Sequence, residues 1–384
     1  MSLFFFAPLF FLTLAAAYLA VAAVASLRNG GPGTLCDPSR KFAVVVPAHD
    51  EETTIGTTLR SLRNIDYPKE LFEIVVIADN CTDGTADVVR SMGVRCLERT
   101  DPERRGKGQA LRHAFDILLS EDFEAVAVID ADTVVQGNFL SVMNARLQKG
   151  ELVLQARYGV TNPDESPLAY MLAVGNCVEN DLFLKGRERL GLPGILRGNG
   201  MCFDAGFLRD HPWDASSVVE DTEYSLELLR KGIQTRIITR TEVLAPLPRD
   251  LEQAAGQRVR WASGNSRLTR LSGFKLMAEG FRTRQWPLVD MGWCLFVRSK
   301  PLLLFMALSM LVLCSFFDAL AVWAFWLAVF YISYLFWGMI TLGLNYSRFL
   351  LALRAPLYLV WLIGISILGL TGFRAGEWIR TKRS

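Results

Sequence analysis

The sequence predicts an α/β fold in which a water-soluble domain, built on a mostly parallel sheet, lies between apolar ends that cross a membrane. The first observation is the distribution of charge, because 69 of the 80 charged side chains lie in residues 41–300. The second is that strand-like and helix-like patterns alternate along this charged part, as in parallel sheets. The third is the uncharged run from Ser2 to Leu27, which exceeds the roughly 20 residues that cross a bilayer as a helix. This pattern excludes a simple cytosolic protein, a disordered chain and a disulfide scaffold.

The apolar ends predict the number of membrane spans. Residues 1–27 are expected to form a retained transmembrane helix. A cleaved signal peptide is the alternative, since Ala23-Val24-Ala25 resembles a cleavage site, but no basic segment precedes the run. Residues 301–347 contain a single charge, Asp318, where a turn would divide two spans, and residues 355–373 form a further apolar run. We expect one span before the soluble domain and about three within residues 301–373.

Basic residues near the spans predict the orientation of the chain. Five flank the soluble domain: Arg28, Arg40, Lys41, Arg298 and Lys300. They place that domain in the cytosol. Four more lie in the tail 374–384: Arg374, Arg380, Lys382 and Arg383. Three full C-terminal spans would put the tail outside, so either the positive-inside rule is broken or one segment is re-entrant or interfacial. Residues 271–300 suit amphipathic interface helices, with a solvated helix as the alternative.

The soluble part carries four apolar segments that are typical of buried strands: 42–46, 73–78, 125–129 and 151–155. Helical patterns occupy the stretches 52–62, 85–92, 107–119 and 138–148. In such sheets ligands bind at the carboxyl ends of the strands. Polar and acidic residues follow the strands at these ends, so a ligand site is expected there.

Two of these strand ends are rich in carboxylates. The first strand runs into residues 47–52, PAHDEE, and the third ends in Asp130-Ala131-Asp132. An Asp-x-Asp at the end of an apolar strand can hold a divalent cation that neutralises a substrate diphosphate. Taken alone, such strand ends are also common in turns and helix caps.

Three further patterns lie downstream. Gly198-Asn199-Gly200 can approach a ligand closely, or form a plain turn. Glu220, Asp221 and Glu223 precede a helical pattern over 224–231, where carboxylates either complement the helix dipole or, in a cleft, supply a general base. Residues 257–261, QRVRW, put Gln257, Arg260 and Trp261 on one helical face, which suits a phosphate and a sugar ring or a helix anchored near the membrane.

The net charge and the cysteine content limit the kinds of ligand and cross-link that the sequence predicts. The net charge of +2, without a basic stripe, predicts no nucleic-acid binding. The seven cysteines are scattered without a CxxC, which indicates neither a zinc site nor a disulfide framework and suits a reducing cytosolic face.

Taken in order, the motifs resemble the family 2 glycosyltransferases. The matching segments are PAHDEE (47–52), Asp79, RRGKGQAL (104–111), DAD (130–132), GNGM (198–201), VEDT (219–222) and QRVRW (257–261). The resemblance is to the membrane-bound branch that contains cellulose, chitin-oligosaccharide, hyaluronan and poly-N-acetylglucosamine synthases and ceramide glucosyltransferase. It covers residues 42–262 and implies a GT-A catalytic domain over 41–270. It also implies inverting transfer from a UDP-sugar with Mg²⁺ or Mn²⁺.

The resemblance assigns roles to single residues. Ala48, His49 and Glu51 would line the uridine pocket, Asp79 would hold the uracil or ribose, and Lys107 would contact the nucleotide. Asp130 would face the ribose and phosphates and, with Asp132, the metal ion. Asp221 would be the catalytic base, with Glu220 as its neighbour. Gln257 and Arg260 would contact the diphosphate, whereas Gly198, Asn199, Gly200 and Trp261 would contact the acceptor. The chain departs from the family at His49, where many members have an aromatic residue, and at Asp50, where asparagine is usual.

The resemblance favours transfer to a growing saccharide at the cytosolic face of the cell (inner) membrane by a multi-pass protein, as in exopolysaccharide synthases. The alternative is single-sugar transfer to a lipid, ceramide-like or hopanoid-like, because nearly uncharged spans offer few side chains to line a polymer path. A nucleotide-binding membrane scaffold is the non-enzyme alternative. The expected partners are the UDP-sugar, a saccharide or lipid acceptor, the membrane, and a second copy or a partner subunit.

Overall fold

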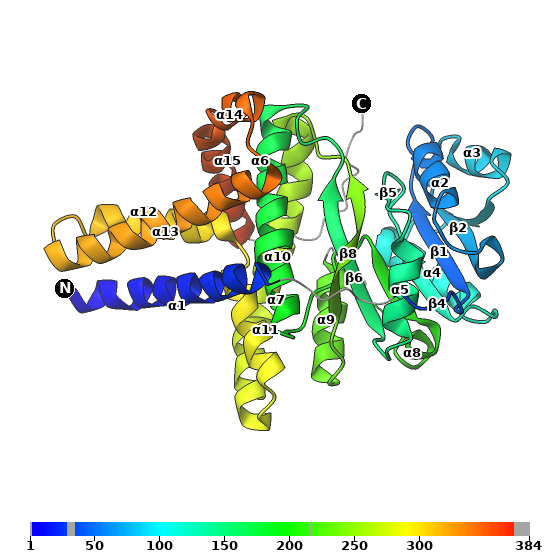
Figure 1. Cartoon of the computed structure of the whole chain (residues 1–384), viewed down its shortest axis with the longest axis horizontal. Helices are drawn as coiled ribbons and strands as arrows, with labels where there is room; N and C mark the ends of the chain where they lie inside the picture. The colour runs from blue at the N-terminus through cyan, green and yellow to red at the C-terminus, as the bar shows by residue number, and fades with distance from the viewer. Residues whose placement is uncertain (1, 29–34, 215–216, 218, 372–384) are drawn as a thin grey trace. The chain divides into compact units, whose positions relative to one another are not determined.

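The computed structural model describes residues 2–28, 35–214, 217 and 219–371, and the expected basic tail 374–384 lies outside these residues. The chain divides into two compact units (Figure 1). The sheet unit comprises residues 30–161 and 193–246, and the helical unit comprises residues 1–29, 162–192 and 247–384. Each unit is described separately.

The sheet unit contains one eight-stranded sheet. Its strands are β1 (Phe42–Ala48), β2 (Phe72–Asp79), β3 (Arg95–Arg99), β4 (Ala125–Val128), β5 (Val134–Val135), β6 (Val153–Val160), β7 (Met201–Asp204) and β8 (Arg236–Ala245). The order is β3-β2-β1-β4-β7-β6-β8-β5. Strands β3, β2, β1 and β4 are parallel, as are β6 and β8, whereas β7 runs antiparallel to both neighbours and β5 antiparallel to β8. The predicted α/β fold with a mostly parallel sheet is confirmed.

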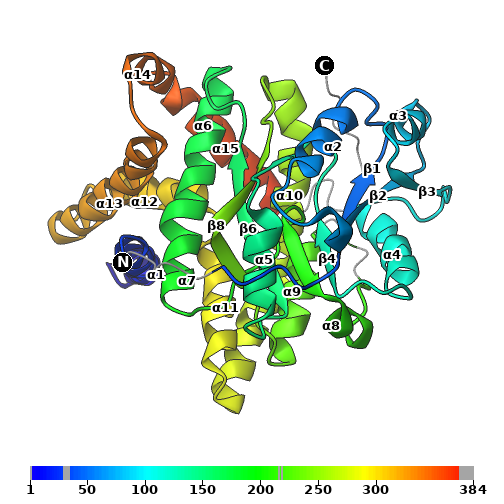
Figure 2. The same ribbon diagram turned by 45° about the vertical axis from the view of Figure 1, so that its right-hand side comes forward.

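Helices cover both faces of this sheet (Figure 2). One face packs against α2 (Ile55–Arg63), α3 (Thr85–Ser91) and α5 (Phe139–Leu147). The other packs against α4 (Lys107–Leu118), α8 (Ala205–Asp210) and α9 (Glu220–Arg230). A short 3₁₀ helix, η1 (Lys69–Leu71), precedes β2. Side chains of β1 alternate between the faces, with Val44 and Val46 toward the first group of helices and Ala43 and Val45 toward the second.

The helical unit is built of helices, most of them apolar. They are α1 (Ser2–Ser26), α6 (Pro167–Cys177), the π-helix η2 (Val178–Leu184), α7 (Lys185–Arg189), α10 (Leu251–Thr283), α11 (Trp286–Val297), α12 (Lys300–Leu313), α13 (Asp318–Leu342), α14 (Tyr346–Ala352) and α15 (Ala355–Leu370). Helices α1, α12 and α13 lie side by side (Figure 1).

Two described helices are long and apolar enough to cross a membrane, Phe4–Ser26 and Asp318–Leu342. Two helix pairs meet the same test only together and are bent, α11 with α12 by 65° and α14 with α15 by 50°. The expected turn at Asp318 is confirmed, since α12 ends at Leu313 and α13 begins at Asp318. One span before and three after the soluble domain would require each bent pair to be one span, so that count stays a prediction.

Residues 162–192 belong to the helical unit, although they lie inside the range 41–270 that the resemblance assigned to the catalytic domain. Helix α7 crosses α1 closely, because a Cβ added to Gly186 would lie 1.9 Å from the Ala22 carbonyl oxygen. A Cβ on Gly338 of α13 would similarly lie 2.3 Å from the Val178 side chain. The chain therefore leaves the sheet after β6, packs among the apolar helices, and returns before the loop 198–200.

Candidate active site

The loops that follow β1 and β2 bring together four of the predicted site residues. Ala48 is paired with Ala78 in the parallel register of these strands. His49 Nδ1 lies 2.7 Å from the carbonyl oxygen of Asp79, and the Glu51 amide donates to Thr85 Oγ1 at 2.7 Å. Ala48, His49, Glu51 and Asp79 thus line one edge of the sheet.

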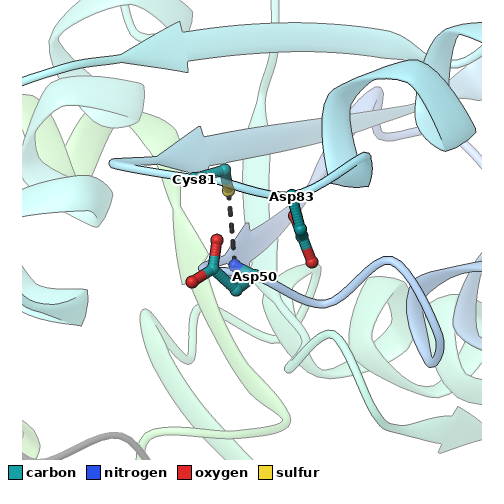
Figure 3. Close-up of side chains that lie close together, drawn as sticks. All are labelled: Asp50, Cys81 and Asp83. Atoms are coloured by element: carbon teal, nitrogen blue, oxygen red, sulfur yellow. Dashed lines mark hydrogen bonds between the residues drawn. The ribbon is translucent and has the colours of Figure 1, made fainter.

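Asp50, Cys81 and Asp83 lie close together in the same two loops (Figure 3), with ligand atoms within 4.8 Å of one another. Hydrogen bonds account for this arrangement. Asp50 Oδ1 accepts from the Thr82 amide at 2.6 Å, and Asp83 Oδ1 accepts from the Thr85 amide at 3.0 Å, at the start of α3. Aspartate thus suffices at position 50, because the described bonds of its side chain to Thr82 need only an acceptor.

Asp79 is held by an arginine that the sequence did not single out. Its Oδ1 accepts from Arg99 Nη1 at 2.5 Å and from Asn80 Nδ2 at 3.1 Å. Both side chains of the ion pair are less than a tenth exposed. Arg99 ends β3, which is adjacent to β2 in the sheet, and the sequence pattern of β3 was not recognised as a strand.

A second group of predicted residues surrounds Gly198. Lys107 Nζ forms an ion pair with Asp130 and donates to the Gly198 carbonyl at 2.7 Å. A Cβ at Gly198 would lie 3.4 Å from Lys107 Nζ and 3.5 Å from Asp221 Oδ2, and its φ of 78° favours glycine. A cation and two carboxylates, Lys107, Asp130 and Asp221, therefore meet around Gly198, which has no side chain.

These charges shift one another's pKa values. Burial, and then the charge of Asp221, raise the pKa of Glu220 to about 7, while Lys107 acts in the opposite direction. Burial would lower the pKa of Lys107, but the carboxylates of Asp130, Glu220 and Asp221 outweigh it and raise that pKa. Lys107 is thus held as a cation beside carboxylates that compete for protons.

Asn199 fixes the geometry of this group. It is fully buried, accepts from the Asp130 amide at 3.1 Å and donates to Thr133 Oγ1 at 2.8 Å. Its carbonyl accepts from Gln155 Nε2 at 2.7 Å. Gly200 has a φ of 71°, and a Cβ there would lie 2.8 Å from Val243. Asn199 and Gly200 therefore hold the loop in place, and their predicted contact with the acceptor stays a prediction.

Tyr158 and Arg197 also lie in this region and were missed by sequence reasoning. Burial, followed by the charges of Asp130 and Asp132, raises the pKa of Tyr158. The Arg197 guanidinium lies over the Tyr158 ring, 5.4 Å from its centre. Tyr158 is near the end of β6, beyond the residues 151–155 that were recognised as a strand.

Gln257, Arg260 and Trp261 lie on α10 in the helical unit, as their helical spacing predicted. Trp261 is 38% exposed. Their approach to the residues of the sheet unit stays a prediction.

The fold and these strand ends define a class of enzyme, a glycosyltransferase with a GT-A-like α/β domain. The family model described as glycosyltransferase like family 2 matches residues 38–264, more than half of the chain. The chain belongs to glycosyltransferase family 2.

Several known proteins share part of this chain. A probable glycosyltransferase, YdaM of Bacillus subtilis, is 24% identical over 254 residues, which cover 64% of this chain and 59% of YdaM. A beta-monoglucosyldiacylglycerol synthase of Nostoc is 26% identical over 201 residues, 48% of this chain and 40% of that enzyme. A UDP-forming cellulose synthase catalytic subunit of Pseudomonas fluorescens is 26% identical over 259 residues, 63% of this chain and 33% of that subunit. The chain thus spans less than two thirds of the length of each.

The mannosyltransferase PcManGT of Pyrobaculum calidifontis, solved in complex with GDP-Man and Mn²⁺, has a similar structure. The TM-score is 0.52 at 17% identity, and the alignment covers 96% of this chain and 97% of that one. This similarity confirms the predicted GT-A-like fold.

Proposed function

We propose that the chain transfers a sugar from a UDP-sugar to a hydroxyl group of a membrane lipid, with inversion at the anomeric carbon. The supporting observation is the meeting of Lys107, Asp130 and Asp221 around Gly198 in a family 2 glycosyltransferase domain. A cation for the diphosphate and a carboxylate for the acceptor proton are the two groups that such a transfer requires.

The donor would bind along the carboxyl ends of β1, β2 and β4. Ala48, His49 and Glu51 would line the uridine pocket, and Asp79 would contact the uracil or ribose while Arg99 compensates its charge. Lys107 is held by a carboxylate and a carbonyl, so it can turn toward the diphosphate without being desolvated anew.

Asp130 and Asp132 would hold Mg²⁺ or Mn²⁺. Both are only partly buried at the end of a fully buried strand, and their hard oxygen donors suit these cations. PcManGT was solved with Mn²⁺. The cation, when bound, would neutralise the charge that develops on the leaving diphosphate.

Asp221 would act as the base. Its carboxylate accepts the proton of the attacking hydroxyl as the new glycosidic C–O bond forms and the bond from the anomeric carbon to the diphosphate oxygen breaks. One displacement inverts the anomeric carbon and forms no sugar–enzyme bond. Glu220 would tune the basicity of Asp221, and Lys107 with Arg260 would stabilise the departing UDP.

The acceptor that we propose differs from the one that the resemblance favours. The resemblance favoured a growing saccharide. The helical unit offers two to four candidate spans, and two of its buried cations, Arg187 and Lys300, are each paired with a carboxylate. Pairs packed in this way favour a compact lipid site over a hydrated path for a polymer. One relative is named a glucosyldiacylglycerol synthase. We therefore propose a lipid acceptor, with the catalytic domain at the cytosolic face of the membrane.

The test uses the full chain in liposomes with labelled UDP-glucose, UDP-galactose and UDP-N-acetylglucosamine. One glycolipid product is expected from the preferred donor, and Mg²⁺ or Mn²⁺ is expected to be required. A ladder or a large polymer would instead establish the saccharide synthase. UDP binding in calorimetry without turnover on any acceptor would establish the nucleotide-binding scaffold.

Asp221→Asn should abolish turnover while retaining UDP binding, because it removes the base and keeps the shape. The loss should exceed a thousandfold, or about 4 kcal/mol in the barrier. Glu223→Gln, at the same end of α9, is the matched control and should retain most activity. Full activity of Asp221→Asn would exclude the proposed base.

A further inference from the structure

The helical unit contains buried ionic groups that the transfer chemistry does not use. Lys300, at the start of α12, forms an ion pair with Glu179 of the π-helix η2 and lies over the Phe183 ring, 4.0 Å from its centre. Arg187 of α7 pairs with Asp290 of α11 at 2.7 Å. These groups come from segments far apart in the sequence, so they meet only in the folded unit.

The charges of this cluster are balanced. Arg187 is 1% exposed and pairs with Asp290, which also accepts from the Tyr18 hydroxyl at 2.7 Å. The Lys300 side chain is 7% exposed and pairs with Glu179. Two cations thus face two carboxylates, which leaves no surplus positive charge to attract a phosphate. A ligand at this cluster would be neutral and would bind through hydrogen bonds.

Tyr334 of α13 supplies a buried hydroxyl that could form a hydrogen bond with such a ligand. It is 6% exposed, and its hydroxyl has no hydrogen-bond partner among the described residues. Helix α13 packs against η2, the helix that carries Glu179, and Gly338, one turn after Tyr334, lies against Val178. Tyr331, one turn earlier, donates its hydroxyl to the Leu12 carbonyl at 2.8 Å. Buried hydroxyls are nearly always bonded, so the exception at Tyr334 needs an explanation.

We propose that Glu179, Lys300 and Tyr334 form a subsite for the neutral, hydroxyl-bearing headgroup of the acceptor lipid. This inference rests on the proposed function. Glu179 lies in a π-helix, an element that occurs frequently at functional sites. Tyr334 lies on α13, a helix that is long and apolar enough to cross a membrane.

The experiment compares Tyr334→Phe with wild type in the full chain, with dioleoylglycerol as the probe. The phenol oxygen has no described partner to lose, so without lipid the Tm and the Kd for UDP should be unchanged. The KM for dioleoylglycerol should rise about tenfold, which is the change expected from the loss of one hydrogen bond. The rise in Tm that dioleoylglycerol causes in wild type should be lost.

Tyr331→Phe is the matched control on the same helix. It removes the bond to Leu12, so its Tm should fall while its KM for dioleoylglycerol stays that of wild type. Wild-type lipid response in Tyr334→Phe would overturn the subsite and leave an ordinary water as the partner of the phenol. The subsite would also be overturned if dioleoylglycerol did not raise the Tm of wild type, or if dioleoylphosphatidic acid raised it more. Failure of wild type to bind UDP would instead refute the proposed function.

Discussion

Glu220 offers a measurable link between the charge cluster and stability. Its pKa is raised from 4.5 to about 7 by burial and then by the neighbouring Asp221. The folded protein therefore binds this proton more tightly than the unfolded chain. The contribution of Glu220 to the free energy of unfolding is greatest below pH 4.5 and is lost as the pH rises through 7. Above that range the contribution no longer changes with pH. The loss reaches up to about 3 kcal/mol at pH 8.

Glu220→Gln replaces the carboxyl by a neutral group of the same shape. The variant should exceed wild type in stability by about 1 kcal/mol at pH 5 and by up to about 3 kcal/mol at pH 8. For a unit of this size the advantage in Tm should widen by roughly 5 °C between these values. Thermal unfolding at both pH values measures this, and hydrogen exchange of the α9 amides shows whether the effect is local.

Glu223→Gln, in the same first turn of α9, controls for the helix dipole and for net charge. An advantage of Glu220→Gln that is equal at pH 5 and pH 8 would refute the raised pKa, and with it the packing of two carboxylates beside Lys107. A variant that is more stable yet slower would show that the charge cluster is retained for function at the expense of stability.

Three further variants test the packing around the site and the helices. Asn199→Ala should lower the stability of the sheet unit by about 2–3 kcal/mol in thermal unfolding, because it strands buried partners at Asp130 and Thr133. Gly186→Ala should sharply reduce the yield of folded protein, since its Cβ would meet the α1 backbone, whereas Gly175→Ala, with open space around it, should gain up to about 1 kcal/mol. Lys107→Met should raise the KM for the UDP-sugar at least tenfold in a UDP-release assay, with an unchanged lipid-induced rise in Tm.

The sequence predicted the parts of the fold in which local pattern and burial agree. The strands β1, β2 and β4 are apolar runs that end in polar residues, so their carboxyl ends and the residues His49, Asp79 and Asp130 were placed correctly. Strand β7 has four residues and pairs antiparallel with both neighbours, and β8 carries charged side chains, so neither has a clear apolar pattern.

Contacts between distant segments could not be predicted from one sequence. Glu179 and Lys300 are 121 residues apart, and each alone resembles a solvated charge. The sequence of α6 is typical of a buried helix, and its pattern does not indicate whether it packs in the sheet unit or in the helical unit. Arg99 was missed for the same reason. It lies on β3, and only the pairing of β3 with β2 in the folded sheet brings it to Asp79.

The excursion of residues 162–192 into the helical unit means that the catalytic half of this protein cannot be cut out as one continuous piece. A fragment of residues 38–264 would keep α6 but lose α1, α11 and α13, and the apolar surface left bare would drive aggregation. A water-soluble version would need residues 162–192 exchanged for a polar connection from Thr161 to Pro193. By the same logic, a substitution in α1 that disturbs its packing against α7 should also disturb residues 162–192, which lie inside the range that matches the glycosyltransferase family.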